Sequence, residues 1–211
     1  MKNVLVLGAT GQIAQWAIDT LQNQADVALT LFVRNKSKLK NVISNNTRII
    51  EGDVLNIEQL TDAMQGQDIV YANLAGDMVK QTQNIIHVMN QLNIQRLISI
   101  NTLGIYDEVP NKFGEWNNQE IGEYFPPYRK SADLIESSNL DYTILRAAWL
   151  TDENEVDFEI THKGDAFKGT VISRKSVAHL VTEIINDPKL YSKENLGVSK
   201  PNSDADKPYF M

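Results

Sequence analysis

Two glycines near the start of the chain are spaced as in turns that bind phosphate. The run VLVLGATGQIA places Gly8, Gly11 and Ala14 directly after an apolar stretch and at the start of a helical pattern. In such a turn Gly8 makes the sharp bend, Gly11 lets the backbone approach a pyrophosphate, and Ala14 keeps the helix close to the sheet. The helix N-terminus adds unpaired N–H groups and a partial positive charge. The alternative is a tight strand-to-helix connection with a structural role only. The residues that we predict to bind the pyrophosphate of a dinucleotide are Gly8, Thr10, Gly11, Gln12 and Ile13.

A basic residue ends the second predicted strand, in the run LTLFVRNKSK. In dinucleotide-binding folds an acidic residue at this position bonds the ribose 2′-hydroxyl, whereas an arginine accommodates a 2′-phosphate. Here the position holds Arg34, followed by Lys36 and Lys38. An arginine fork pairs well with phosphate and stacks on adenine. We therefore predict NADP in preference to NAD, the alternative being a solvated basic turn.

The elements that must hold these residues alternate between strands and helices. Short β-branched runs separate longer segments of helical period, which is typical of βαβ units in a parallel sheet. Ser173 is expected to cap a helix that stops at Pro188, and an alternative interpretation of EGDV is a strand end followed by a helix-capping turn at Asn56. Right-handed crossovers then favour an α/β fold with a doubly wound, mostly parallel Rossmann-type sheet and helices on both faces. The predicted strands are residues 3–7, 27–33, 47–51, 69–73, 96–100, 142–145 and 196–199.

Two segments interrupt this alternation, residues 102–128 and residues 149–170. Both follow predicted strands at their carboxyl ends, where open α/β sheets bind ligands. We expect irregular but ordered loops that add a small substrate lobe to a single domain of residues 1–211. Their aromatic residues Trp116, Phe125 and Trp149 are candidates for an apolar cover over a planar substrate.

Composition excludes several classes of function. The chain has no cysteine, and its three histidines show no ligand spacing, so we expect no metal site. A formal net charge of −7 opposes binding to nucleic acid and to anionic membranes. Neither a signal-peptide core nor a run of about 18 apolar residues is present, so we predict a cytoplasmic protein. The sequence leaves the oligomeric state open.

Four motifs together resemble the atypical short-chain dehydrogenase/reductase superfamily: GATGQIA, VRN, EGDV and DYTILRAAWL. Within it, the chain is similar to small NAD(P)-binding proteins grouped with NmrA-like regulators and with flavin- or biliverdin-reductase-like enzymes. The resemblance implies that Asp53 and Val54 border the adenine, and that Asn73, Leu74 and Ala75 border the adenosine ribose and the pyrophosphate. From the residues alone, EGDV and NLAG also fit plain connections between a strand and a helix.

The same resemblance also implies which residues are catalytic. Enzymes of this superfamily carry a Ser or Thr after the fifth strand and a Tyr-x-x-x-Lys motif, whose lysine holds the nicotinamide ribose and lowers the tyrosine pKa. Thr102 is the predicted hydroxyl, and Lys130 stands in the lysine position. Pro126 occupies the tyrosine position, and proline donates no proton. Tyr128 is therefore the candidate donor, with Tyr106 and Tyr124 also nearby in sequence.

A missing proton donor narrows the reaction class. Flavins and quinones can draw their protons from solvent after hydride transfer, whereas carbonyl reduction needs a positioned acid. We therefore predict NADPH-dependent hydride transfer to a small conjugated substrate such as a flavin or quinone. The alternative is a non-catalytic, NADP-sensing regulator of the NmrA-like type.

Overall fold

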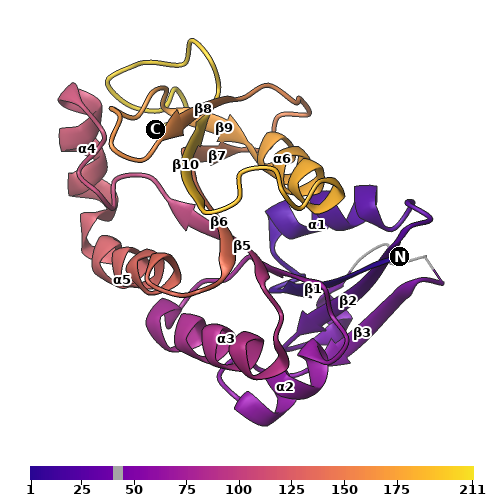
Figure 1. The fold of residues 1–211 in the computed structure, drawn as a ribbon. Coiled ribbons are helices and arrows are strands. Elements are labelled where there is room, and N and C mark those ends of the chain that lie inside the picture. The colour runs from indigo at the N-terminus through magenta and orange to yellow at the C-terminus, as the bar shows by residue number, and fades with distance from the viewer. Residues whose placement is uncertain (40–44) are drawn as a thin grey trace.

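A computed structural model describes residues 1–39 and 45–211, and its centre is an eight-stranded sheet (Figure 1). The strand order is β3-β2-β1-β4-β5-β6-β10-β8, with every neighbouring pair parallel except β10 and β8. This is the predicted doubly wound Rossmann-type sheet. The strands are β1 (Lys2–Leu7), β2 (Val27–Val33), β3 (Thr47–Glu51), β4 (Ile69–Ala72), β5 (Arg96–Thr102), β6 (Asp141–Ala147), β8 (Glu159–His162) and β10 (Glu194–Ser199).

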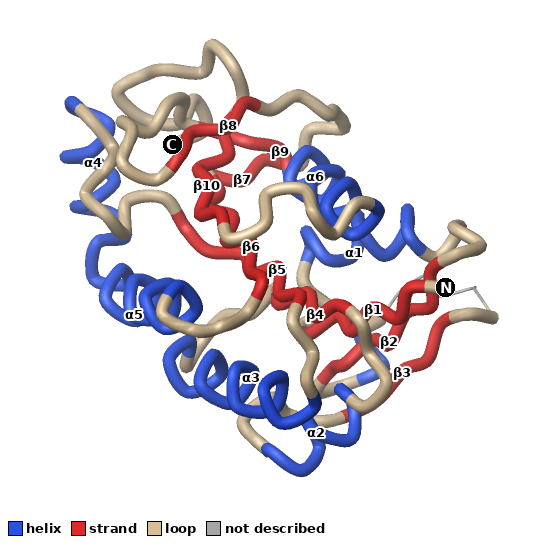
Figure 2. The backbone as a smooth tube through the Cα atoms, in the orientation of Figure 1, coloured by secondary structure: helices blue, strands red, loops and turns tan. Residues whose placement is uncertain are grey.

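Helices cover both faces of this sheet (Figures 1 and 2). One face packs against α1 (Gln12–Leu21) and α6 (Arg174–Asn186), and the other against α2 (Ile57–Met64), α3 (Met78–Leu92) and α5 (Phe125–Glu136). Burial on both faces explains why the central strands are continuously apolar, as in β1, where Val4 to Leu7 are fully buried. Each face has its own apolar core.

Side-chain caps fix three helix starts. Asn56 accepts a hydrogen bond from the Gln59 N–H at 3.1 Å, and Ser173 accepts one from the Ser176 N–H at 3.0 Å. The predicted cap at Ser173 is confirmed, the alternative interpretation of a capping turn at Asn56 also holds, and α6 ends at Asn186, two residues before Pro188. Asp77 caps α3 in the same way. The helix α1 differs, because its N-cap is Gly11 and no side chain caps it.

The expectation of an irregular backbone over residues 102–128 is wrong. Helix α4 (Asn111–Ile121) and the first turn of α5 occupy most of this segment. Pro126 and Pro127 lie in that first turn, where backbone N–H groups have no intrahelical acceptor and proline costs nothing. The proline pair therefore starts a helix here.

The sheet boundaries also differ in detail from the prediction. All seven predicted strands exist, but β4 ends at Ala72, and both β5 and β6 run further than expected. The strands β7 (Trp149–Thr151) and β9 (Val171–Ser173) form a separate parallel pair. They and β8 fall in or next to the second interrupted segment, and strands of three or four residues give too few alternations to be seen in a sequence.

Two further findings concern residues 1–39 and 45–211. No helix in these ranges is long and apolar enough to cross a bilayer. Nor do the same ranges bring three His, Asp or Glu side chains together as a metal site would require.

Candidate functional site

A cleft of about 530 Å³ opens at the carboxyl ends of β1 to β4, and we call it the glycine cleft. It gathers most of the residues predicted to bind a dinucleotide, from four separate strand ends. The lining residues are Gly8, Thr10, Gly11, Phe32, Val33, Arg34, Asn35, Lys38, Gly52, Asp53, Val54, Asn73, Leu74, Ala75 and Gln81.

The two glycines of the first turn pack directly against Asn73. Gly8 has a φ of +75°, and a Cβ added to it would lie 2.1 Å from the Asn73 carbonyl oxygen. A Cβ on Gly11 would lie 2.2 Å from Nδ2 of Asn73. Neither position has room for a side chain. The turn after β1 and the chain after β4 are thus in contact, which fixes the start of α1 at the floor of the cleft.

The start of α1 is suited to an anion. The first N–H groups of a helix have no intrahelical acceptor, and at α1 no side chain replaces one. Their partial positive charge lies beside the cleft, since Gly11 lines it. A pyrophosphate would fit this position, so the residues present are compatible with a dinucleotide.

The far end of the glycine cleft is basic. Arg34 and Lys38 both line it and both are exposed. Asp53 lines the same end, where its Oδ1 accepts a hydrogen bond from the Leu55 N–H at 2.9 Å. Glu51 accepts a hydrogen bond from the Lys36 N–H at 3.1 Å, and it does not line the cleft. Two cations and one carboxylate therefore surround this end among the residues that the structure describes.

A second cavity of about 360 Å³ adjoins the glycine cleft, and we call it the tyrosine cavity. The two hollows share Asn73 and Leu74. The ends of β5 and β6 contribute one side of the cavity and the start of α5 another. The lining residues are Ile13, Asn73, Leu74, Ile100, Asn101, Thr102, Ile121, Tyr124, Phe125, Tyr128, Ala147, Ala148 and Leu150.

Two tyrosines four residues apart line this cavity. Tyr124 precedes α5 and is 57% exposed, whereas Tyr128 lies one turn further and is half-buried. Burial raises the pKa of Tyr128, so its hydroxyl stays protonated at neutral pH. Asn101 holds this wall, because its Nδ2 donates to the Tyr128 carbonyl at 3.2 Å and its Oδ1 accepts from the Thr102 N–H at 2.8 Å.

Lys130 does not join Thr102 and Tyr128. It is exposed on α5 and lines neither hollow. Two residues along a helix correspond to about 200° of rotation, so a residue two places after Tyr128 faces away from the cavity. The pair that shares the cavity face is Tyr124 and Tyr128. This spacing is visible in the sequence as YFPPY, but only the packing of α5 shows which face it serves.

The remaining predicted residues are placed as follows. Ile13 lines the tyrosine cavity, whereas Gln12 is exposed at the first position of α1 and lines neither hollow. Of the three aromatic residues expected to cover a substrate, Phe125 lines the cavity. Trp116 and Trp149 instead pack on each other, with ring centroids 4.9 Å apart. The contributions of Ile100, Ile121, Ala147, Ala148 and Leu150 were not predicted, because each depends on a tertiary contact.

A buried ion pair supports the wall of the tyrosine cavity. Glu108 and Arg146 form a salt bridge with 6% and 1% of their side chains exposed. The Glu108 carboxylate also accepts from the N–H groups of Gly104 at 3.1 Å and Tyr106 at 2.8 Å. A Cβ on Gly104 would lie 2.6 Å from the Phe125 ring. The pair therefore fixes the loop after β5 against a cavity-lining aromatic residue.

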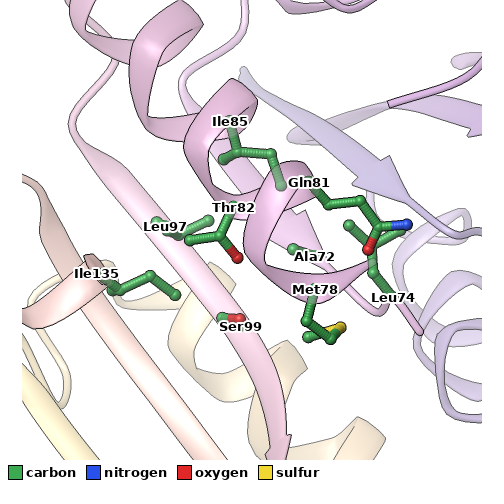
Figure 3. Close-up of a pocket in the computed structure, with 9 residues that line it drawn as sticks. All are labelled: Ala72, Leu74, Met78, Gln81, Thr82, Ile85, Leu97, Ser99 and Ile135. Atoms are coloured by element: carbon green, nitrogen blue, oxygen red, sulfur yellow. The ribbon is translucent and has the colours of Figure 1, made fainter. Parts of the chain in front are cut away.

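A third, much smaller void lies between α3, β4 and β5 (Figure 3). Thr82 and Ser99 line it together with apolar side chains, and Leu74 and Gln81 separate it from the glycine cleft. Its volume is about 10 Å³, which is about the space of one water molecule. This void is therefore a packing defect and no substrate site.

Comparison with known proteins agrees with this geometry. Residues 8–188 match the model of a family described as NAD(P)H-binding. A Rossmann-fold NAD(P)-binding family protein from Shigella flexneri is 47% identical over 100% of both chains, with a TM-score of 0.88. A short-chain dehydrogenase/reductase from Veillonella parvula, solved in complex with NADP, is 29% identical over 99% of both chains, with a TM-score of 0.92.

One curated relative is more distant and longer. An isoflavone reductase homologue from Nicotiana glauca is 22% identical over 215 residues, which include 90% of this chain. The chain spans 66% of that relative's length.

Proposed function

The chain belongs to the NAD(P)H-binding family, and from that premise we propose that it catalyses hydride transfer from NADPH to a small conjugated acceptor such as a quinone or a flavin. The observation that carries this proposal is the shared border of the two hollows at Asn73 and Leu74. A dinucleotide lying along the glycine cleft from Arg34 to Gly11 would extend over this border. Its reactive ring would then enter the tyrosine cavity beside the acceptor.

The preference for NADPH over NADH rests on the basic end of the glycine cleft. Arg34 and Lys38 both line the end that is remote from α1. A 2′-phosphate there would form charge-assisted hydrogen bonds, which are about twice as strong as neutral ones. The related Veillonella parvula protein was solved with NADP, which supports the same preference here.

This chain's own residues would bind and orient the reactants. When bound, NADPH supplies the hydride. Thr102, Tyr124 and Tyr128 present hydroxyls that can donate hydrogen bonds to an acceptor oxygen. No lysine lines the cavity among the residues that the structure describes, and the pKa of Tyr128 is raised by burial. Neither tyrosine is therefore activated as a proton donor in this mechanism. The proton that completes the reduction comes from water.

The test follows the loss of NADPH absorbance with a panel of quinones, flavins and aldehydes. We expect turnover with quinones and flavins and none with aldehydes. Ala148→Trp would fill the tyrosine cavity and should abolish turnover while NADPH still binds in calorimetry. Tight binding of NADPH without turnover of any acceptor would overturn the proposal.

A second candidate function is an NADP-sensing regulator. The exposed position of Lys130, away from the cavity, favours it, because no lysine is then available to activate a proton donor. Such a protein would report cofactor state through conformation, so its hydrogen exchange over residues 103–128 should differ between NADP and NADPH. Equal exchange with both cofactors, together with turnover of any acceptor, would exclude this alternative.

A further inference from the structure

We propose that the tyrosine cavity selects an uncharged, planar acceptor and rejects one that carries a phosphate, carboxylate or sulfonate. This inference rests on the proposed function, since it names the class of acceptor. It favours a quinone over a phosphorylated flavin.

The lining of the tyrosine cavity carries no charge. Across residues 1–39 and 45–211, every side chain that lines it is apolar, aromatic, hydroxyl or amide. A buried anion without a cation partner is strongly disfavoured in such surroundings. The volume of about 360 Å³ is near the lower end for ligand pockets, which are on the order of 300–1,000 Å³. An acceptor beside the nicotinamide ring therefore has to be small, and its charged group would have to be enclosed or extend to the mouth.

Two of the three cations on α5 and β6 are already paired. Arg129 on α5 pairs with Asp133 at 2.8 Å and lies 4.3 Å from the Tyr106 ring. Arg146 on β6 pairs with Glu108 inside the protein. Lys130 is exposed and outside the lining. None of the three is placed to neutralise an anion in the cavity.

The mouth of the cavity gives an anion no better position. Leu150 is shared with a shallow surface hollow that is also lined by Asp152, Glu153 and Arg174. Arg174 is held by Asp152 at 2.8 Å. Exposed Glu123 directly precedes Tyr124, which lines the cavity. An anionic group that extends out of the cavity therefore meets carboxylates or a cation that is already paired.

The polar groups that do line the cavity suit a neutral carbonyl. The hydroxyls of Thr102, Tyr124 and Tyr128 have no hydrogen-bond partner among the described residues, so each is available to a ligand. A carbonyl oxygen needs only such donors. The ring of Phe125 adds an apolar surface for a flat molecule.

The test compares 1,4-naphthoquinone with 1,4-naphthoquinone-2-sulfonate, which share a ring system and differ in charge. The 211-residue chain has no cysteine that a quinone could alkylate. We expect kcat/KM with NADPH to be at least about 30-fold higher for the neutral quinone, equivalent to about 2 kcal/mol. Calorimetric titration of both compounds into protein loaded with tetrahydro-NADPH, whose ring is neutral and donates no hydride, should show the same preference in binding.

Two variants at Leu150 test whether charge causes the preference for the neutral quinone. Leu150→Lys puts a cation at the border of the cavity and should reduce the ratio of the two kcat/KM values at least about tenfold. Leu150→Met changes the same side chain without adding a charge, so this variant should keep the original ratio of the two kcat/KM values. Equal kcat/KM for the two quinones would overturn the inference and leave the proposed function standing. No turnover of either quinone would overturn the proposed function, and calorimetric binding would then test the selectivity alone. Binding of only the neutral quinone would support the selectivity. Equal binding of both quinones, or binding of neither, would overturn it.

Discussion

The glycine cleft and the tyrosine cavity meet at Asn73 and Leu74, yet they are built in different ways. The glycine cleft is formed by strand ends and by backbone contacts at Gly8 and Gly11, and its far end is basic. The tyrosine cavity is uncharged, and buried side-chain pairs hold its wall. One half of the site is therefore set by strand ends and the glycine turn, and the other by the packing of side chains.

The largest expected effect concerns the side-chain pair behind the tyrosine cavity. Glu108→Gln would leave the Arg146 guanidinium buried without its counter-charge, and we expect the free energy of unfolding to fall by about 4 kcal/mol in urea denaturation. The control is Asp206→Asn, since Asp206 pairs with Lys112 on the surface with 72% and 75% of the side chains exposed. That change should cost under about 0.5 kcal/mol. Equal losses would show that the buried pair has no special role in holding the wall.

Substitution at the glycine turn of the glycine cleft should destabilise the protein nearly as much. Gly8→Ala combines a φ of +75° with a Cβ 2.1 Å from a carbonyl oxygen, and we expect a loss of about 3 kcal/mol in stability and loss of NADPH binding. Gly66 is a matched control, because its φ is +72° and nothing lies within 4 Å of an added Cβ. Gly66→Ala should cost about 1 kcal/mol, from the backbone alone. Similar losses in urea denaturation would contradict the contact with Asn73.

The positive charge at the far end of the glycine cleft should determine the preference for NADPH over NADH. Arg34→Asp is expected to weaken NADPH binding about 100-fold, or about 2.7 kcal/mol, and NADH binding less than about threefold. Arg48→Asp makes the same change of charge on β3 outside the cleft and should leave both affinities within about twofold. Calorimetry with both cofactors measures this. Equal losses of NADPH and NADH affinity in Arg34→Asp would remove Arg34 from the 2′-phosphate site.

The smallest expected effect is the pH response of the tyrosine cavity. Burial raises the pKa of Tyr128, so the folded protein holds this proton more tightly than the unfolded chain does. Stability is then lost as pH rises from the ordinary tyrosine pKa of about 10 towards the folded value. Tyr128→Phe should reduce this alkaline loss by under about 1 kcal/mol, measured as the difference between urea midpoints at neutral and alkaline pH. Tyr128 ionising below its ordinary pKa, seen by tyrosinate absorbance, would indicate an activated proton donor.

The sequence predicted the glycine cleft better than the tyrosine cavity, and the reason is physical. The turn at Gly8 and Gly11 is local, and parallel strands bring their carboxyl ends to one edge, so Arg34 could be placed beside it from the pattern of strands. Asp53 and Asn73 were assigned to the same site by the resemblance to the dehydrogenase/reductase superfamily. Ser173 was predicted as a cap because a cap acts within four residues.

The tyrosine cavity needed information that a sequence pattern does not hold. Helix α4 has Gly114 in its first turns, which obscures its pattern, although the Val109 carbonyl leaves no room there for a Cβ. Lys130 was assigned to the lysine position by the resemblance to the dehydrogenase/reductase superfamily alone. Which face of α5 meets the cavity depends on packing against the sheet, and this selects Tyr124 and Tyr128.

The proline pair at the start of α5 has a consequence for binding. Pro126 and Pro127 have fixed φ angles, and the residue before each is itself restricted. The segment that carries Phe125 and Tyr128 is therefore stiff before any ligand arrives. A ligand that enters beside it loses little affinity to the ordering of the protein. The proline in the predicted tyrosine position thus preorganises the surface on which an acceptor would rest.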